Sequence, residues 1–236
     1  MTTYSKAVTV HSRLFVLDLD RCLITDRAYT LLDEVVAESG IINLDLFQEA
    51  RRKREASGGS FDSIAWLQSQ ESFGEQEYNL LLTQYVARAR QMGDDILLAP
   101  GARALLDGLR QHTVPHIIMT YGGRASQLAK IQAAGLERIA YIVVDHKNKA
   151  AYIAEWWDEV KGLYTVNLDN DSLQAEAVVL VDDKAAAFTD LPSAPLASGY
   201  WVKSSGLLLP SQEGEIPSNV RSVANLHEIV DLERLY

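Results

Sequence analysis

The chain has 236 residues, 47% of them hydrophobic and 23% charged, which excludes a disordered or fibrous protein and allows one sizeable α/β domain or a core with a smaller insert. The formal net charge of −10 disfavours polyanionic partners, so we expect neither nucleic acid nor an anionic membrane surface. With one cysteine, no apolar run of bilayer length and no signal-peptide pattern in the first residues, we expect a cytoplasmic protein.

The first predicted element is a buried strand that runs into acids. In RLFVLDLDRCLIT, residues 13–25, four apolar residues lead to Asp18 and Asp20. Further short apolar segments, rich in β-branched and aromatic residues, predict strands at 116–120, 139–145, 177–183 and 199–203. Helical patterns separate most of them, at 102–112, 124–136 and 149–160. Apolar strands that alternate with helices predict an α/β fold with a doubly wound parallel sheet, covered on both faces.

Residues 25–97, which we call the helical block, show helical periodicity and no strand pattern. The sequence SGGS at 57–60 divides the block into two pairs of helices. The helices are expected at 26–40, at 44–56 with Asn43 as N-cap, at 62–70 and at 75–92. A block of this length is too long for a simple crossover between two strands. We therefore predict an α-helical subdomain at 25–97, inserted into a core domain that comprises residues 1–24 and 98–236.

Polar side chains stand at the carboxyl ends of three predicted strands: Asp18 and Asp20, then Thr120, then Asp182 and Asp183. In an open parallel sheet these ends share one edge, where ligands bind. Carboxylates crowded there repel one another, and a cation relieves the repulsion; oxygen ligands of this kind suit Mg²⁺. The alternative is that each acid is only a turn residue or a helix N-cap, which is common after a strand. The conjunction of all three strand ends favours a site.

Three stretches resemble, in order, the first, second and fourth motifs of the haloacid dehalogenase-like (HAD) superfamily of aspartate-dependent phosphotransferases. They are LFVLDLDRCL, IIMTYGG and VVLVDD; the stretches APGARALLDGLR and NVRSVANLHEIV are also similar to the family. The resemblance spans the whole core and implies a Rossmann-like sheet. The helical block lies where the family carries a helical cap, between motifs one and two.

The resemblance implies roles for the acids. Asp18 would be the nucleophile that forms an aspartyl-phosphate, which divides one difficult transfer into two easier ones. Asp20 would protonate the leaving oxygen and afterwards activate water. The backbone carbonyl of Asp20, with the side chains of Asp18 and Asp182, would ligate Mg²⁺. Family dehalogenases lack the second acid and transport ATPases carry Thr there, so Asp20 indicates a phosphatase or a phosphomutase.

The same resemblance implies a phosphate-binding loop after the second motif. Thr120 would donate a hydrogen bond to a phosphoryl oxygen, and the backbone N–H groups around Tyr121 and Gly122 would help to bind it. Glycine at this place lets the main chain approach an anion closely.

A lysine is expected to neutralise the remaining phosphate charge and to orient Asp18. Lys149 fits the place that the family gives to this residue, and Lys147 is the alternative. Asp183 would hold that lysine or a metal-bound water. A solvated surface lysine remains the competing interpretation.

The chain departs from the family pattern after Asp20, where Arg21-Cys22 replaces the usual Gly-Thr. Arg21 could reach a partner, the cap or the substrate. Cys22 is expected to pack as a small buried residue, with a nucleophilic or redox role as the alternative. The basic run at 51–54 could bind substrate from the helical block, or form a solvated helix face in which Glu49 pairs with Lys53.

The leading functional hypothesis is a Mg²⁺-dependent phosphatase that hydrolyses a small phosphomonoester, a small phosphorylated metabolite. A phosphomutase of the same fold would transfer the phosphoryl group to a second hydroxyl instead of to water. A catalytically silent HAD-like binding or regulatory protein is the third possibility, because function is set by the site and not by the fold. The sequence gives no expectation for the oligomeric state.

Overall fold

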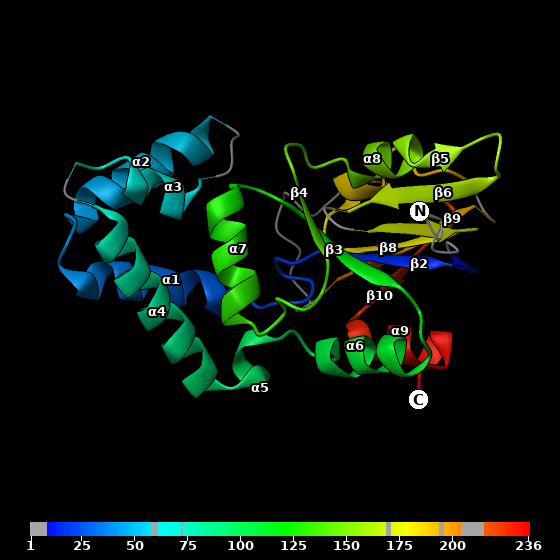
Figure 1. Cartoon of the computed structure of the whole chain (residues 1–236), viewed down its shortest axis with the longest axis horizontal. Coiled ribbons are helices and arrows are strands. Elements are labelled where there is room, and N and C mark those ends of the chain that lie inside the picture. Colours follow the sequence, from blue (N-terminus) through cyan, green and yellow to red (C-terminus); the bar gives the residue numbers. More distant parts are fainter. Residues whose placement is uncertain (1–8, 58–60, 72, 169–170, 194–195, 204–214) are drawn as a thin grey trace, which may run out of the picture.

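The main sheet has six parallel strands in the order β10-β9-β8-β2-β3-β4 (Figure 1). This computed structural model describes residues 9–57, 61–71, 73–168, 171–193, 196–203 and 215–236. The strands are β2 (Leu14–Leu17), β3 (His116–Tyr121), β4 (Tyr141–Val144), β8 (Val178–Asp182), β9 (Ala197–Val202) and β10 (Val220–Val223). The predicted parallel α/β fold is confirmed, and all five predicted strands form. Strand β10 is the one member of this sheet that the sequence did not predict.

Apolar side chains of the central strand β2 alternate between two cores. Phe15 and Leu17 pack on the face that helices α6 (Ala102–Gln111) and α9 (Leu226–Glu233) cover. Leu14 and Val16 pack on the opposite face, against helix α8 (Lys149–Glu155). Because both faces are covered, the strand needs apolar residues at every position, which explains its continuous hydrophobic run.

A second, smaller sheet in the order β1-β7-β6-β5 lies on the same face as α8. The sequence analysis did not predict it. Its strands are β1 (Val10–His11), β5 (Trp157–Asp158), β6 (Leu163–Asn167) and β7 (Ser172–Ala175). Strands β5, β6 and β7 pair antiparallel, whereas β1 and β7 pair parallel.

The prediction of a helix over 149–160 was wrong at its C-terminal end: the helix ends at Glu155, and the chain then enters the second sheet. The carboxylate of Asp158 accepts hydrogen bonds of 3.1 Å from two backbone N–H groups of the following turn. Gly162, with φ of +65°, then reverses the chain into β6. The Trp157 and Tyr164 rings, on paired residues of β5 and β6, meet edge to face with centroids 5.0 Å apart. A turn and a cross-strand aromatic pair therefore replace the last helical turn.

The helices of the helical block form at the predicted places. They are α1 (Arg27–Ser39), α2 (Leu44–Ala56), α3 (Ser63–Gln68), α4 (Glu75–Met92) and the additional short α5 (Asp94–Leu97). The side chain of Asn43 accepts a hydrogen bond of 2.9 Å from the N–H of Asp45, as expected of an N-cap. Residues 58–60 of the predicted break lie outside the described residues.

Helix α7 (Arg124–Ala133) stands between the helical block and the main sheet (Figure 1). It contacts α1, α3 and α4 of the block. The two connections between block and sheet pair with each other: Thr25 N–H donates to Leu97 O at 2.8 Å, and Ala99 N–H donates to Leu23 O at 2.9 Å. The division into a core and an inserted subdomain stays a prediction. No helix among the described residues is long and apolar enough to cross a bilayer.

Candidate active site

Three adjacent strands deliver polar side chains to one edge of the main sheet. Asp18 directly follows β2, Thr120 lies near the end of β3, and Asp182 ends β8. Strand β2 pairs with both β3 and β8, so the three residues meet at the centre of the sheet. All three are at most 2% exposed. The predicted gathering of the strand ends is therefore present.

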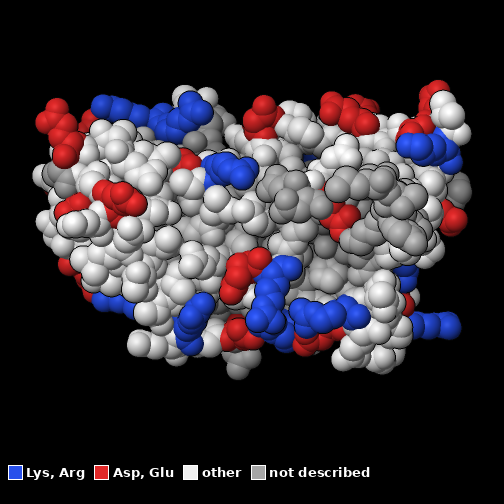
Figure 2. All heavy atoms as spheres, in the orientation of Figure 1, with Lys and Arg blue, Asp and Glu red and all other residues white. Residues whose placement is uncertain are grey.

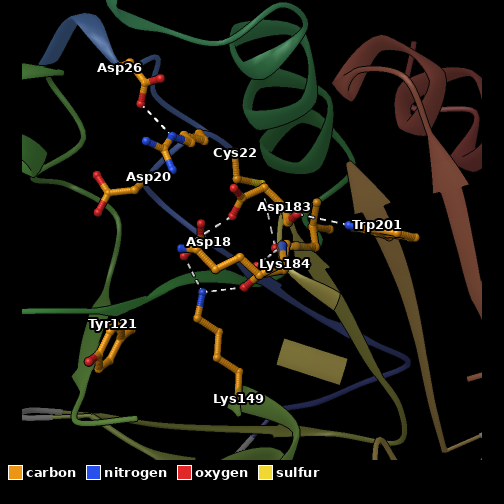
Figure 3. A network of polar contacts seen from close by, with 12 residues as sticks. Asp18, Asp20, Cys22, Asp26, Tyr121, Lys149, Asp183, Lys184 and Trp201 are labelled. Atoms are coloured by element: carbon orange, nitrogen blue, oxygen red, sulfur yellow. Dashed lines mark hydrogen bonds and ion pairs between the residues drawn. The ribbon is translucent and has the colours of Figure 1, made fainter. Parts of the chain in front are cut away.

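Lys149 joins two of these acids (Figure 3). It is the first residue of α8, whose N-cap Asn148 accepts a hydrogen bond of 3.2 Å from the backbone. Its ammonium contacts Asp18 and lies 2.6 Å from Asp182. Burial alone would lower the pKa of Lys149, but these two carboxylates raise it above its ordinary value. The alternative, Lys147, places its ammonium 5.9 Å from the centre of the Tyr121 ring.

The carboxylates of Asp18, Asp182 and Asp183 form a cluster that could hold a metal ion, with one oxygen of each within 4.8 Å of the others. The buried Oδ2 of Asp18 has no hydrogen-bond partner among the described residues. Burial and the charge of Asp182 raise the pKa of Asp18 to about 7, against the opposing effect of Lys149. An unpaired oxygen in an all-carboxylate set fits Mg²⁺.

This cluster differs in membership from the predicted metal ligands. Asp183, predicted to hold a lysine or a metal-bound water, brings its carboxylate into the cluster. Its Oδ1 lies 3.7 Å from the ammonium of Lys184. The side chain of Asp20 lies outside the cluster, and the predicted metal contact through its backbone carbonyl stays a prediction.

Asp20 has its own set of partners. Lys130 places its ammonium 2.6 and 2.7 Å from the two carboxylate oxygens, and the amide of Gln127 donates at 3.0 Å. The hydroxyl of Tyr29, from α1, is 3.4 Å away. In Figure 3 the carboxylate of Asp20 points away from Asp18. Burial would raise the pKa of Asp20, but Lys130 and Gln127 hold it below its ordinary value, so the carboxylate is ionised at neutral pH.

The sequence analysis did not identify Lys130 as a site residue. Helix α7 buries the face that carries Gln127, Lys130 and Ile131, and Lys130 is 1% exposed. A lysine on the apolar face of a predicted helix requires an acid opposite it, because a buried charge is costly without a partner. The position of Lys130 on the apolar face of the predicted helix could therefore have indicated that it has a buried acidic partner.

The carboxyl end of β3 and Gly122 after it carry the residues that the family resemblance assigns to phosphate binding. The hydroxyl of Thr120 is fully buried and has no hydrogen-bond partner among the described residues. Gly122 adopts φ of +149°, a conformation that strongly favours glycine. Tyr121 and Gly122 line a cleft of about 500 Å³ whose other wall belongs to the helical block. The block contributes Ala50, Arg54, Phe61, Asp62 and Trp66.

Arg21 and Cys22 lie in the tight turn that connects β2 to the helical block. Arg21 adopts φ of +62°, which costs energy for any residue with a side chain. Its Nε donates at 2.7 Å to Asp26, just before α1 (Figure 3). Cys22 is fully buried, its sulfur 3.7 Å from the carbonyl oxygen of Val181, and burial raises the thiol pKa well above its ordinary value. These observations support the packing interpretation of Cys22.

Three members of the basic run of α2 lie in three different surroundings. Lys53 pairs with Glu49 at 2.6 Å on an exposed helix face, as expected. Arg51 pairs with Asp33 and stacks on the Phe47 ring, 5.0 Å from its centre. Arg54 lines the cleft beside Tyr121. Arg54 is therefore the member of the run that the structure places near the candidate site.

The fold was compared with proteins of known sequence and structure. No protein-family model and no curated protein sequence matches the chain. A haloacid dehalogenase-like hydrolase of Burkholderia xenovorans LB400 superposes with a TM-score of 0.52 at 16% identity, over 95% of this chain and 97% of that one. The HAD-hydrolase YfnB of Bacillus subtilis, solved bound to magnesium, gives 0.52 at 15% identity, over 95% and 99%. A HAD phosphatase of Thermococcus onnurineus gives 0.50 at 17% identity, over 95% and 98%.

These similarities extend over nearly the full length of both chains in each pair. The protein therefore has the haloacid dehalogenase-like fold, as the three sequence motifs predict.

Proposed function

We propose that the protein is a Mg²⁺-dependent phosphatase that hydrolyses a small phosphomonoester through an aspartyl-phosphate. The observation that carries the proposal is the joint position of Asp18, Asp182 and Lys149. The lysine contacts both acids, and an unpaired oxygen of Asp18 remains for a ligand. This arrangement combines a nucleophile, a positive charge for the phosphate and a metal-binding cluster within one buried site.

In the proposed reaction, a carboxylate oxygen of Asp18 attacks phosphorus while the bond to the leaving oxygen breaks. Asp20, once protonated, gives its proton to the leaving oxygen; water then attacks the aspartyl-phosphate and returns a proton to Asp20. Thr120 and Lys149 donate hydrogen bonds to the phosphoryl oxygens. Mg²⁺, held by Asp18, Asp182 and Asp183, would neutralise charge shared by phosphate and carboxylates.

The substrate fits the cleft lined by Tyr121 and the helical block. Its volume of about 500 Å³ suits a small metabolite, and its lining combines the rings of Phe61 and Trp66 with the charged groups of Arg54, Asp62 and Asp145. On the face that Figure 2 shows, basic and acidic side chains are interspersed. That mixture and the net charge of −10 favour a small phosphate ester over a polyanion.

The test is release of inorganic phosphate from p-nitrophenyl phosphate and from a panel of phosphorylated metabolites. We expect turnover with Mg²⁺, loss of turnover with EDTA, and a loss of at least about a thousandfold in Asp18→Asn, because the nucleophile is removed. Asp107→Asn, which alters an exposed acid of α6, is the matched control and should keep full activity. Absence of Asp18-dependent release across the panel would refute the proposal.

The second candidate is a catalytically silent binding protein, and the engagement of Asp20 by Lys130 favours it. A carboxylate held by an ammonium in the resting protein has no proton to give. Binding of Mg²⁺ and inorganic phosphate by calorimetry, without turnover of any ester, would support this alternative. Transfer to an added sugar phosphate in place of water would indicate a phosphomutase.

A further inference from the structure

One carboxylate of the helical block caps two helices. Asp62 precedes α3 and accepts a hydrogen bond of 3.0 Å from the N–H of Ala65. The same carboxylate accepts from the N–H groups of Ala125 and Ser126, both at 3.2 Å, in the first turn of α7. The hydroxyl of Ser126 donates to it at 2.7 Å and accepts from the N–H of Ile64 at 3.2 Å. Asp62 therefore connects the start of α3 to the start of α7.

Gly123 makes this approach possible. A Cβ at this position would lie 2.0 Å from the Cβ of Asp62, far inside van der Waals contact. A carboxylate at the first turn of a helix is favourable, because it meets unpaired N–H groups and the positive end of the helix dipole. The second glycine of the TYGG stretch thus has a role separate from that of Gly122.

Helix α7 also contacts Asp20, one turn beyond its contact with Asp62. Gln127 directly follows Ser126, and Lys130 lies about one helical turn further along. These two side chains supply the amide and the ammonium that hold Asp20. One end of α7 is thus attached to the helical block, and the next turn holds the proposed acid-base residue.

We propose that Asp62 is a positioning residue for Asp20. By seating the helical block on the first turn of α7, it fixes the helix whose Gln127 and Lys130 orient the Asp20 carboxylate. The catalytic part of this inference rests on the proposed phosphatase function. Because Tyr29 of α1 also contacts Asp20, displacement of the block loosens this support from two sides.

Two substitutions disturb the contact from opposite partners. Asp62→Asn keeps the Oδ1 acceptor for Ala65 and Ser126, but it turns an NH₂ group toward the N–H of Ala125 and removes the negative charge at the first turn of α7. Gly123→Ala leaves Asp62 intact and forces it away through the new Cβ. Asn43→Ala is the matched control, because it removes the N-cap of α2 inside the helical block.

The first measurement needs no turnover. In ¹³C-carboxyl NMR of the substrate-free full-length protein, with the Asp20 signal assigned by Asp20→Asn, both variants should shift that signal. Asn43→Ala should leave it unchanged. An Asp20 signal that stays in place in Asp62→Asn and Gly123→Ala would overturn the inference, whether or not the protein is a phosphatase.

The second measurement compares leaving groups. An alkyl phosphate requires protonation of its leaving oxygen, whereas p-nitrophenolate leaves readily without it. In both variants kcat should fall about tenfold more for the alkyl ester than for the aryl ester, since only the alkyl ester needs the misplaced acid, whereas a change in the cleft that Asp62 and Gly123 line affects both esters. Equal losses for both esters would contradict the positioning role and would indicate an effect on the cleft or on stability instead. Failure of the wild type to release phosphate would refute the phosphatase proposal and leave the NMR result to decide the positioning role.

Discussion

The ammonium of Lys130 lies within 2.7 Å of both carboxylate oxygens of Asp20, and neither residue is more than 8% exposed. Removal of one charge from a buried pair leaves the other without compensation. We expect Lys130→Met to lower the free energy of unfolding by about 3–5 kcal/mol, measured by urea denaturation. Lys130→Met combined with Asp20→Asn should recover part of this loss. Equal stability of the single and double variants would contradict a coupled pair.

Substitution of Lys149 should change magnesium binding and phosphatase activity, whereas substitution of Lys147 should change neither. Lys149→Met removes the positive charge between Asp18 and Asp182, so Mg²⁺ should raise the melting temperature of this variant more than that of the wild type. Phosphatase activity should be lost. Lys147→Met removes a charge that faces the Tyr121 ring and should leave both quantities near wild type. The reverse order would assign the phosphate-neutralising role to Lys147.

Magnesium affinity should depend on pH near neutrality. The pKa of Asp18 is raised to about 7, mainly by burial, so without metal this carboxyl is largely protonated below that pH. Mg²⁺ binds the ionised form, and the proton competes with it. Affinity measured by calorimetry should therefore weaken as pH falls from about 8 to about 6. In Asp18→Asn this dependence should flatten; an equally steep profile would assign it to another group.

Arg21 offers a test of backbone strain. At φ of +62°, glycine is favoured over a residue with a Cβ, so Arg21→Gly should be more stable than Arg21→Ala by about 1 kcal/mol. Both variants lose the contact with Asp26, so the comparison isolates the backbone. Chemical denaturation of the pair measures the difference. If alanine is as stable as glycine, the turn has relaxed into another conformation.

Cys22 should be chemically inert in the folded protein. Its side chain is fully buried and its thiol pKa is raised, so little thiolate is present. Iodoacetamide should label it at a rate set by unfolding, with full labelling in denaturant. Rapid labelling under native conditions would restore the nucleophilic or redox interpretation.

The sequence predicted the parallel sheet and the residues at its carboxyl edge because apolar strands and the acids after them are local patterns. Asp18, Thr120 and Asp182 could be placed together, since parallel strands share one edge. Lys149 depended on the family resemblance, and the structure puts its ammonium on Asp18, as predicted, and on Asp182, which was predicted as a metal ligand only. The helices α1, α2 and α4 of the helical block could be predicted equally well, because they are long and periodic, whereas the short α5 was not predicted.

The second sheet and the contacts of Lys130 and Asp62 could not be predicted, because they depend on tertiary contacts. The strands of the second sheet have two to five residues, and β7 reads SLQA, so they carry no apolar run. Periodicity could place Lys130 on the buried face of a helix, but it could not indicate that Asp20 lies opposite. Asp62 was recognisable as the first residue of a predicted helix, whereas its contact with α7 joins residues more than 60 positions apart.

The pairing between the two connections of the helical block has a mechanical consequence. Because Thr25 bonds to Leu97 and Ala99 bonds to Leu23, the outgoing and returning chains form a short two-stranded ribbon. Such a ribbon resists stretching and sliding, but it bends across its width. Displacement of the block along the direction of these chains would therefore have to break both hydrogen bonds, so the two connections act as one tether between the block and the sheet.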